Sequence, residues 1–373
     1  MRLLRYLSFR FFALAVTATL MLAAIAEVLD LVDNAGDILD RGEGAAGFIE
    51  YLSLRTPTLI AHSLPLGALI GALAALAFLA RNSEIVAMRA AGRSSWELFA
   101  LMVPGAFVLA VAQCALLDVV LPKTQRSLAV WWAAGPDPKI HSDKPAWLRL
   151  GDQIISFEGL RDRGRTLVNL KVYDRDAEKV AIGRTTAAEA RYEKRRWTLV
   201  GATHTSWLRD SFNVQTPADG PWRTTLTPAD AVAALTPGGL MSSDSAQEVL
   251  AGERVANAPP SFYATLIQRI YAGPMGVAVM LLLAMPAAFL NWRDARSARY
   301  VFVGLGLGLS FLLTDGLLTS LGGAGVLSPV VGAWSGVILF AAIGAFNLFR
   351  MERGLARPRL SRAAGNLLPE PSR

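Results

Sequence analysis

Apolar residues gather in six long runs along this chain, separated by short polar segments and by one long polar stretch. An α-helix needs roughly 20 residues to cross the ~30 Å hydrocarbon core of a bilayer, and each run comes close to or exceeds that length. Three runs precede the long polar stretch and three follow it. The pattern predicts six membrane-spanning helices, at about 4–32, 57–80, 96–121, 262–290, 300–321 and 329–349.

The long polar stretch, 122–261, has the length of a domain and a different periodicity. Val168, Leu170 and Val172 alternate with polar residues, and short apolar segments recur between turn-forming residues at a spacing of roughly 8–12, as in antiparallel β-strands. We therefore expect a membrane α-helical protein with an inserted antiparallel β domain, a small sandwich or partly open barrel. The divisions are 1–121, 122–261 and 262–349, followed by an Arg- and Pro-rich tail, 350–373, expected to be disordered.

Composition and charge support a membrane protein. The chain is 53% hydrophobic and only 18% charged, whereas soluble chains average about 25% charged residues. Segments 1–10, 81–97, 291–299 and 350–373 carry 15 of the 37 Lys and Arg but only 5 of the 30 Asp and Glu. This positive-inside pattern predicts that both termini are cytoplasmic and the β domain is periplasmic. A nucleic-acid binder would instead concentrate positive charge on its folded domain, so no nucleic-acid partner is expected.

Motifs of catalysis are absent from the sequence. It contains no G-x-x-x-x-G-K-[ST], H-E-x-x-H or G-x-S-x-G, so it cannot bind ATP through a P-loop of its own. Cys114 is the single cysteine, and His62, His141 and His204 lie in separate regions. We expect a non-catalytic chain with no metal site and no bound cofactor.

The basic loop after the second run predicts a short amphipathic helix at about 83–92. Ser83 can cap it, Glu84 suits its first turn, and Gly92 suits its end. Two interpretations stay open: a connector lying in the membrane interface, or a coupling helix that docks into a cytoplasmic partner. Just beyond it, Ser94 and Glu97 have the spacing of a capping box at the start of the third span. Thr56 and Pro57 predict the start of the second span in the same way.

Ionisable residues inside membrane spans are costly and are treated as functional hypotheses. Asp315 lies midway through the fifth span, and Glu27 and Asp30 lie near the outer end of the first. The bland interpretation is that Glu27 and Asp30 mark where the helix leaves the membrane. Gly304 and Gly308, in the fifth span, have the spacing that permits close helix approach.

The sequence resembles the permease subunits of the bacterial lipopolysaccharide export system, the LptF/LptG family. The resemblance covers nearly the whole chain. It rests on the layout of three spans, domain and three spans, on the loop 79–92 (LARNSEIVAMRAAG), and on 274–280 (PMGVAVM) in the second half. The stretches 31–33 (LVD) and 222–228 (WRTTLTP) look more like the G-type than the F-type subunit.

The resemblance implies a mechanism. A paralogous, LptF-like subunit would pair with this chain, and a cytoplasmic LptB-like ATPase dimer would use ATP and Mg²⁺. Lipopolysaccharide would enter sideways and pass to a jellyroll domain and then to LptC/LptA-like bridge proteins. The residues implied in ATPase coupling are Glu84, Ile85, Met88, Arg89 and Gly92. Those implied at the substrate cavity and lateral gate are Glu27, Asp30, Asp33, Gly304, Gly308 and Asp315.

One departure from the family concerns the outer end of the first span. G-type relatives often carry lysines there, facing the lipid A phosphates, whereas this chain has Asp30, Asp33 and Asp37. Carboxylates repel phosphate. Three explanations stay open: a bridging divalent cation, a lipid A with different head-group charges, or basic contacts elsewhere, for which the candidates are Arg55, Lys123 and Arg126.

Two other functions fit part of the pattern. A membrane-anchored scaffold or receptor would use the β domain to bind a periplasmic ligand. A secondary transporter would use Asp315 as a proton or ion site near the midplane, but it predicts repeated halves, which the sequence does not display.

Overall fold

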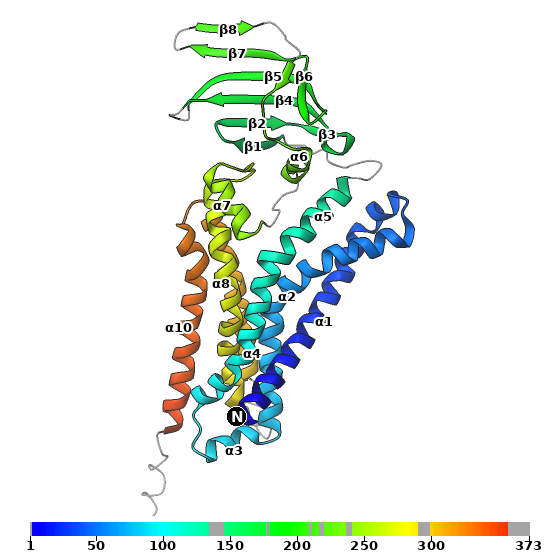
Figure 1. Ribbon diagram of the computed structural model, residues 1–373. Helices are drawn as coiled ribbons and strands as arrows, with labels where there is room; N and C mark the ends of the chain where they lie inside the picture. The colour runs from blue at the N-terminus through cyan, green and yellow to red at the C-terminus, as the bar shows by residue number, and fades with distance from the viewer. Residues whose placement is uncertain are drawn as a thin grey trace, which may run out of the picture.

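The computed structural model describes residues 2–133, 145–176, 178, 180–208, 211–215, 220–235, 241–289 and 299–356. A helical bundle carries the β domain over one end, and the N-terminus lies at the other (Figure 1). Within the described ranges, six helices are long and apolar enough to cross a membrane, which confirms the predicted fold class. The basic loop 290–298 and the tail from 357 onward lie outside the described residues.

The membrane-spanning helices are longer than the apolar runs that predicted them. The third continues from α4 through a π-helix, η1, into α5, and the fourth ends in a 3-10 helix, η3. The elements are α1 (Arg2–Asp40), α2 (Gly44–Arg81), α4 (Ser95–Ala115), η1 (Leu116–Val120), α5 (Leu121–Ala133), α8 (Pro260–Ala284), η3 (Met285–Phe289), α9 (Arg299–Gly323) and α10 (Pro329–Ala356). A seven-residue helix, α3 (Glu84–Ala90), joins α2 to α4.

The predicted start of the second span at Thr56 and Pro57 is wrong. α2 begins at Gly44 and continues through Pro57. Thr56 Oγ1 donates to the Leu52 carbonyl (2.7 Å) inside the helix, so it does not cap an end. The physical reason is tertiary, because contacts with α1 extend along α2 and support the helix past its proline. The two helices form a hairpin that projects at the β-domain end of the bundle (Figure 1).

The α1–α2 hairpin is held by direct backbone contact. A Cβ placed on Gly71 would lie 2.4 Å from the Ala15 Cα, and one on Gly67 would lie 2.7 Å from the Thr19 Cα. No side chain larger than hydrogen fits at these positions. Small residues at helix interfaces replace the hydrophobic driving force that lipid does not provide. α1 is therefore positioned against α2 by two glycines.

The described part of the β domain forms one antiparallel sheet of nine strands, in the order β1-β2-β4-β5-β6-β9 along its main path. The two longest strands, β4 and β5, form its centre: β4 pairs with both β2 and β3, and β5 with both β6 and β7. The strands are β1 (Ala146–Leu150), β2 (Gln153–Phe157), β3 (Gly159–Arg161), β4 (Thr166–Arg175), β5 (Ala181–Glu193), β6 (Arg196–Val200), β7 (Thr203–Leu208), β8 (Ser211–Gln215) and β9 (Gly220–Trp222).

A single core stabilises the sheet on the face that α6 (Pro228–Leu235) covers. Trp197 is buried at its centre, and its indole Nε1 donates to the Leu226 carbonyl at 2.7 Å. A buried indole N–H needs such a partner. The chain then returns to the membrane through α7 (Ser243–Ala251), which packs on α8.

Candidate functional site

The short helix α3 lies at the end of the bundle that carries the N-terminus (Figure 1). Its Ile85 is only 3% exposed and belongs to the core of the helical bundle, and Met88 packs against the same core. Val86, on the other side, is 66% exposed, and Arg89, one turn after Ile85, is exposed as well. One face therefore anchors α3 to its own chain, and the other is open to a partner. The sequence analysis named Ile85 and Met88 for contact with a partner but not Val86, because both faces of α3 contain apolar residues.

The ends of α3 differ in how well they match the prediction. The cap expected from Ser83 is not formed: its φ is 58° and its side chain makes no capping hydrogen bond. Its backbone N–H instead donates to the Ala80 carbonyl (3.1 Å) and so completes the end of α2. Gly92 does end α3, at φ 82°, and the Arg93 N–H donates to the Met88 carbonyl (3.1 Å). Glycine favours this conformation because it has no Cβ.

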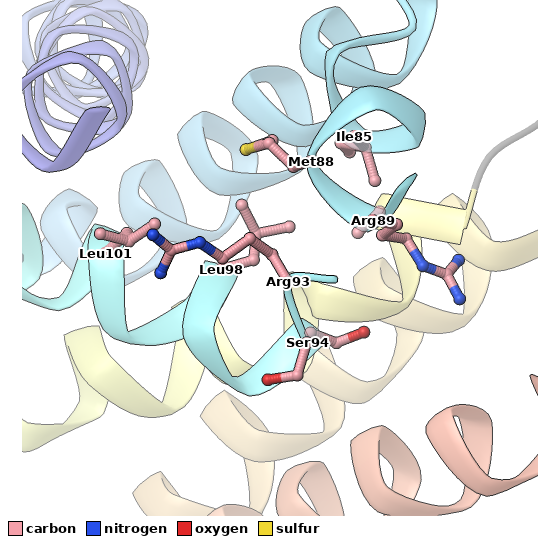
Figure 2. Close-up of a pocket in the computed structure, with 9 residues that line it drawn as sticks. Ile85, Met88, Arg89, Arg93, Ser94, Leu98 and Leu101 are labelled. Carbon is pink, nitrogen blue, oxygen red and sulfur yellow. The ribbon is translucent and has the colours of Figure 1, made fainter. Parts of the chain in front are cut away.

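A small pocket lies where α3 meets the start of α4 and η3 (Figure 2). Its volume is ≈ 10 Å³, about what one water molecule requires. Figure 2 shows the guanidinium groups of Arg89 and Arg93 on opposite sides of it. The pocket is too small for a ligand and is best described as a packed joint. Its lining residues are Ile85, Met88, Arg89, Arg93, Ser94, Ser95, Leu98, Leu101 and Ala288.

The start of α4 is held by its own cap and by the end of α10. Ser94 Oγ accepts from the Glu97 N–H at 3.1 Å, as its spacing predicted. The Glu97 carboxylate does not complete the capping box but accepts from Arg93 at 2.8 Å. Glu352 of α10 accepts from the Ser95 N–H at 2.9 Å. The first and second membrane halves therefore meet beside α3.

Glu84 faces the first helix. Its Oε1 accepts a hydrogen bond from the Tyr6 hydroxyl at 3.3 Å and lies 3.7 Å from an Arg10 guanidinium nitrogen. Asn82 also donates to it, at 3.3 Å. The side chains of Arg10 and Glu84 are 26% and 32% exposed. Sequence reasoning missed Tyr6 and Arg10, since 74 or more positions separate them from Glu84.

A second polar group links α1 to α2 near the opposite end of the bundle. Arg55 binds the Asp30 carboxylate through both Nε and Nη2, the latter at 2.7 Å, and Tyr51 donates to the same carboxylate at 2.5 Å. Thr56 Oγ1 also lies 2.8 Å from a carboxylate oxygen of Glu27. The structure thus brings together Asp30 and Arg55, which the sequence analysis named for separate roles.

The other outer-surface candidates stand apart from this group. Asp33 is exposed on α1, and Lys123 and Arg126 are exposed on α5. An Arg that was not predicted, Arg41, lies with its guanidinium carbon 3.9 Å from the ring centre of Trp131. Its position in the turn between two spans could have indicated it from the sequence.

Asp315 lies inside the second membrane half. It is 2% exposed and forms an ion pair at 2.5 Å with Arg269 of α8, which is 33% exposed. On its other side Gly336 of α10 is so close that a Cβ there would lie 2.8 Å from Asp315 Oδ1. Thr265 and Thr319 add buried hydroxyl oxygens without hydrogen-bond partners. Arg269 was missed, although a lone cation in an apolar run was a usable signal.

Gly304 and Gly308 contact α2 rather than open space. A Cβ on Gly308 would lie 2.3 Å from a Leu69 methyl carbon, and one on Gly304 would lie 3.1 Å from a Leu73 methyl carbon. These glycines therefore receive leucines of α2, within the bundle of this chain. The predicted site residues fall into five places: the α3 end, the outer end of α1 and α2, exposed positions on α5, the contact between α2 and α9, and the α8–α9–α10 interior.

Metal-ligating residues do not cluster: among the residues that the structure describes, no three His, Cys, Asp or Glu side chains gather. That the chain itself binds no cofactor stays a prediction.

Comparison with known proteins adds the family. Residues 5–351 match the family described as lipopolysaccharide export system permease LptF/LptG. The chain belongs to this family. The match spans both membrane halves and the β domain, so this LptF/LptG family member is a multi-pass membrane protein with an inserted β domain.

Curated relatives of this family member are named as the LptG protein. It is 25% identical over 315 residues to the lipopolysaccharide export system permease protein LptG of Haemophilus influenzae, covering 82% of this chain and 86% of the relative. It is 23% identical over 353 residues to LptG of Escherichia coli K12, covering 93% of this chain and 97% of the relative. These relatives agree with the G-type resemblance of the sequence.

Proposed function

We propose that this chain is the G-type permease subunit of an ATP-driven exporter that extracts lipopolysaccharide from the outer leaflet of the bacterial inner membrane. Membership of the LptF/LptG family over residues 5–351 supports this function, as do relatives named LptG. In this arrangement a paralogous, LptF-like subunit completes the membrane part, and an LptB-like ATPase dimer supplies the energy from the cytoplasm. This chain takes no part in the chemistry of ATP hydrolysis.

Both termini and α3 are cytoplasmic in this proposal, and the β domain is periplasmic. The excess of Lys and Arg in 1–10 and 81–97 supports the orientation. The β domain lies at the opposite end of the bundle (Figure 1).

The observation that carries the proposal is the placement of α3. Ile85 fixes it to the bundle core, while Val86 faces outward at the tip of the molecule and Arg89 is exposed beside the pocket that Ile85 lines. A helix anchored in this way transmits a push on its outer face to α2 and α4, which it joins. In the complex, Glu84 and Arg89 provide charged contacts to the ATPase groove and Val86 an apolar one.

The walls of the lipid cavity are α1 and α9 in this proposal. Only 17% of the most apolar stretch of α1 is buried, and only 22% of that of α9, against 83% for α8. These two helices therefore present apolar surface suited to acyl chains and to a paralogous subunit. The glycines of α9 position this wall by receiving the leucines of α2.

Charge at the outer end of α1 is less unfavourable to lipid A phosphates than the sequence indicated. Arg55 neutralises Asp30, which removes one of the three repulsive carboxylates. Lys123 and Arg126 of α5 remain exposed near this end and are the proposed phosphate contacts. Beyond them, a strand edge of the β domain would accept a strand of LptC/LptA-like bridge proteins by β-augmentation, and the lipid would pass onward to those proteins.

Co-purification from membranes tests the proposal. Wild type is expected to bring down a soluble ATPase with measurable ATP turnover. Glu84→Ala is expected to weaken this association by about 1–2 kcal/mol, or about five- to thirtyfold, because it removes a charged contact at an interface rim.

The matched control is Glu97→Ala, which removes a more exposed acid (47% against 32%) that lies 13 positions away and binds Arg93. It is expected to retain the ATPase. If the wild type brings down no ATPase, the exporter fails as an explanation, and a membrane-anchored scaffold or receptor takes its place.

A further inference from the structure

Within its own chain, Glu84 connects α3, which is proposed to dock the ATPase, to α1, which is proposed as a wall of the lipid cavity. Tyr6 and Arg10 lie one turn apart on α1, and both reach Glu84, at 3.3 and 3.7 Å. Arg10 also contacts the Tyr6 hydroxyl. Its guanidinium carbon lies 5.5 Å from the ring centre of Phe78, near the end of α2. Arg10 is therefore a node at which α1, α2 and α3 meet.

We propose that Arg10 is a positioning residue that ties α3 to α1, and that ATPase docking breaks this tie by offering Glu84 a different cation. The inference rests on the proposed function. It makes the Glu84 carboxylate a shared group: it binds Arg10 and Tyr6 in the undocked chain and the ATPase in the docked one. Exchange of the partner then uncouples α3 from α1.

The strength of the contact suits an exchange. An ion pair between side chains that are 26% and 32% exposed is stabilised little, because water and salt screen it. Docking of the ATPase would not break a tight buried ion pair. Without any contact between Arg10 and Glu84, docking at α3 would have no effect on α1. Arg10 keeps a second hold on the bundle through the Phe78 and Tyr6 rings, so its side chain stays in place when the carboxylate leaves.

The link to α1 matters because α1 is the least buried of the six candidate spans among the described residues. α1 approaches α2 closely at Gly67 and Gly71, and its first turns are held in the bundle core by Leu7 and Phe11. Loss of the Glu84 contact would therefore separate α3 from α1 while the start of α1 stays packed. The β-domain end of the same helix carries Asp30 and its link to Arg55.

The test uses the full complex in proteoliposomes and compares wild type with Arg10→Gln, Arg10→Lys and the control Arg5→Gln. Arg5 is an exposed arginine of the same helix, so the control removes the same charge. Two quantities are measured: the affinity for the ATPase, and the ratio of ATP turnover with and without lipopolysaccharide in the membrane.

Arg10→Gln is expected to bind the ATPase about two- to fivefold more tightly, because Glu84 no longer has to leave a partner, and to lose the dependence of turnover on lipopolysaccharide. The affinity change corresponds to about 0.4–1 kcal/mol at 1.4 kcal/mol per tenfold. Arg10→Lys restores the charge and is expected to recover part of the dependence, and Arg5→Gln to match wild type.

Three results would overturn the inference. Arg10→Gln could behave as wild type in both measurements, which would make the contact incidental. It could lose the ATPase as Glu84→Ala does, which would place Arg10 on the docking surface. Arg5→Gln could have the same effect, which would make the effect one of net charge. Absence of an ATPase from the wild-type complex would instead refute the proposed function, and the inference with it.

Discussion

Removal of either member of the Arg269–Asp315 pair should destabilise the protein, but by different amounts. Asp315 is 2% exposed, so Arg269→Ala leaves a carboxylate buried without a cation, at a cost of about 3–5 kcal/mol. Arg269 is 33% exposed, so Asp315→Ala leaves a cation that can turn toward water or head groups. Its cost should fall to about 1–3 kcal/mol, the desolvation penalty of an incompletely buried polar group.

The double variant Arg269→Ala/Asp315→Ala provides the decisive comparison. It removes both charges, so it should be more stable than Arg269→Ala alone, although it has lost more atoms. The two substitutions are then non-additive, with a coupling energy of about 1–3 kcal/mol. The free energy of unfolding can be measured on the purified chain in mixed micelles, by denaturing-detergent titration followed by tryptophan fluorescence.

Asp33→Ala serves as a control, because it removes an exposed acid from α1 and should change the unfolding free energy by less than about 0.5 kcal/mol. Two results would refute the reasoning. Asp315→Ala could be the more destabilising single variant, or the double variant could equal the sum of the singles. Either result would mean that the attraction between the two charges does not offset the cost of burying them.

Two further predictions concern packing and the link to the β domain. Gly71→Ala should destabilise the bundle by about 1–3 kcal/mol, because the added Cβ would lie 2.4 Å from the Ala15 Cα. Gly306→Ala is the control and should not destabilise it, because a Cβ on Gly306 would meet nothing within 4 Å. The same detergent titration compares the two variants. Asp118→Ala should loosen α7, because Asp118 accepts from the Ser243 N–H at 2.6 Å and from its hydroxyl at 3.1 Å. The loss of this cap should cost about 1–2 kcal/mol, and so speed amide hydrogen exchange in α7 about tenfold while leaving α8 unchanged. Equal exchange of α7 in Asp118→Ala and in wild type would contradict this prediction.

The sequence by itself determined the architecture. Six apolar runs and a stretch of alternating residues are local signals, and each reflects the solvent its segment must face. Local chemistry also located the cap at Ser94 and the end of α3 at Gly92, because these depend on neighbours a few residues away. The Pro57 helix start failed because contacts with α1 outweighed the local preference. The Ser83 cap failed within the local chain, because the Ser83 N–H completes the end of α2 through the Ala80 carbonyl.

Only the tertiary structure decided which polar residues meet. The partners of Glu84, Asp30 and Asp315 lie on other helices, and nothing in the spacing along one chain specifies them. Arg10, Arg55 and Arg269 were visible as cations but not as partners, because helix packing brings them within reach. The same holds for the two faces of α3, where the bundle core, not the pattern, selects Ile85 for burial and leaves Val86 exposed. Local hydropathy determines where a segment lies, whereas distance in three dimensions determines which charges pair.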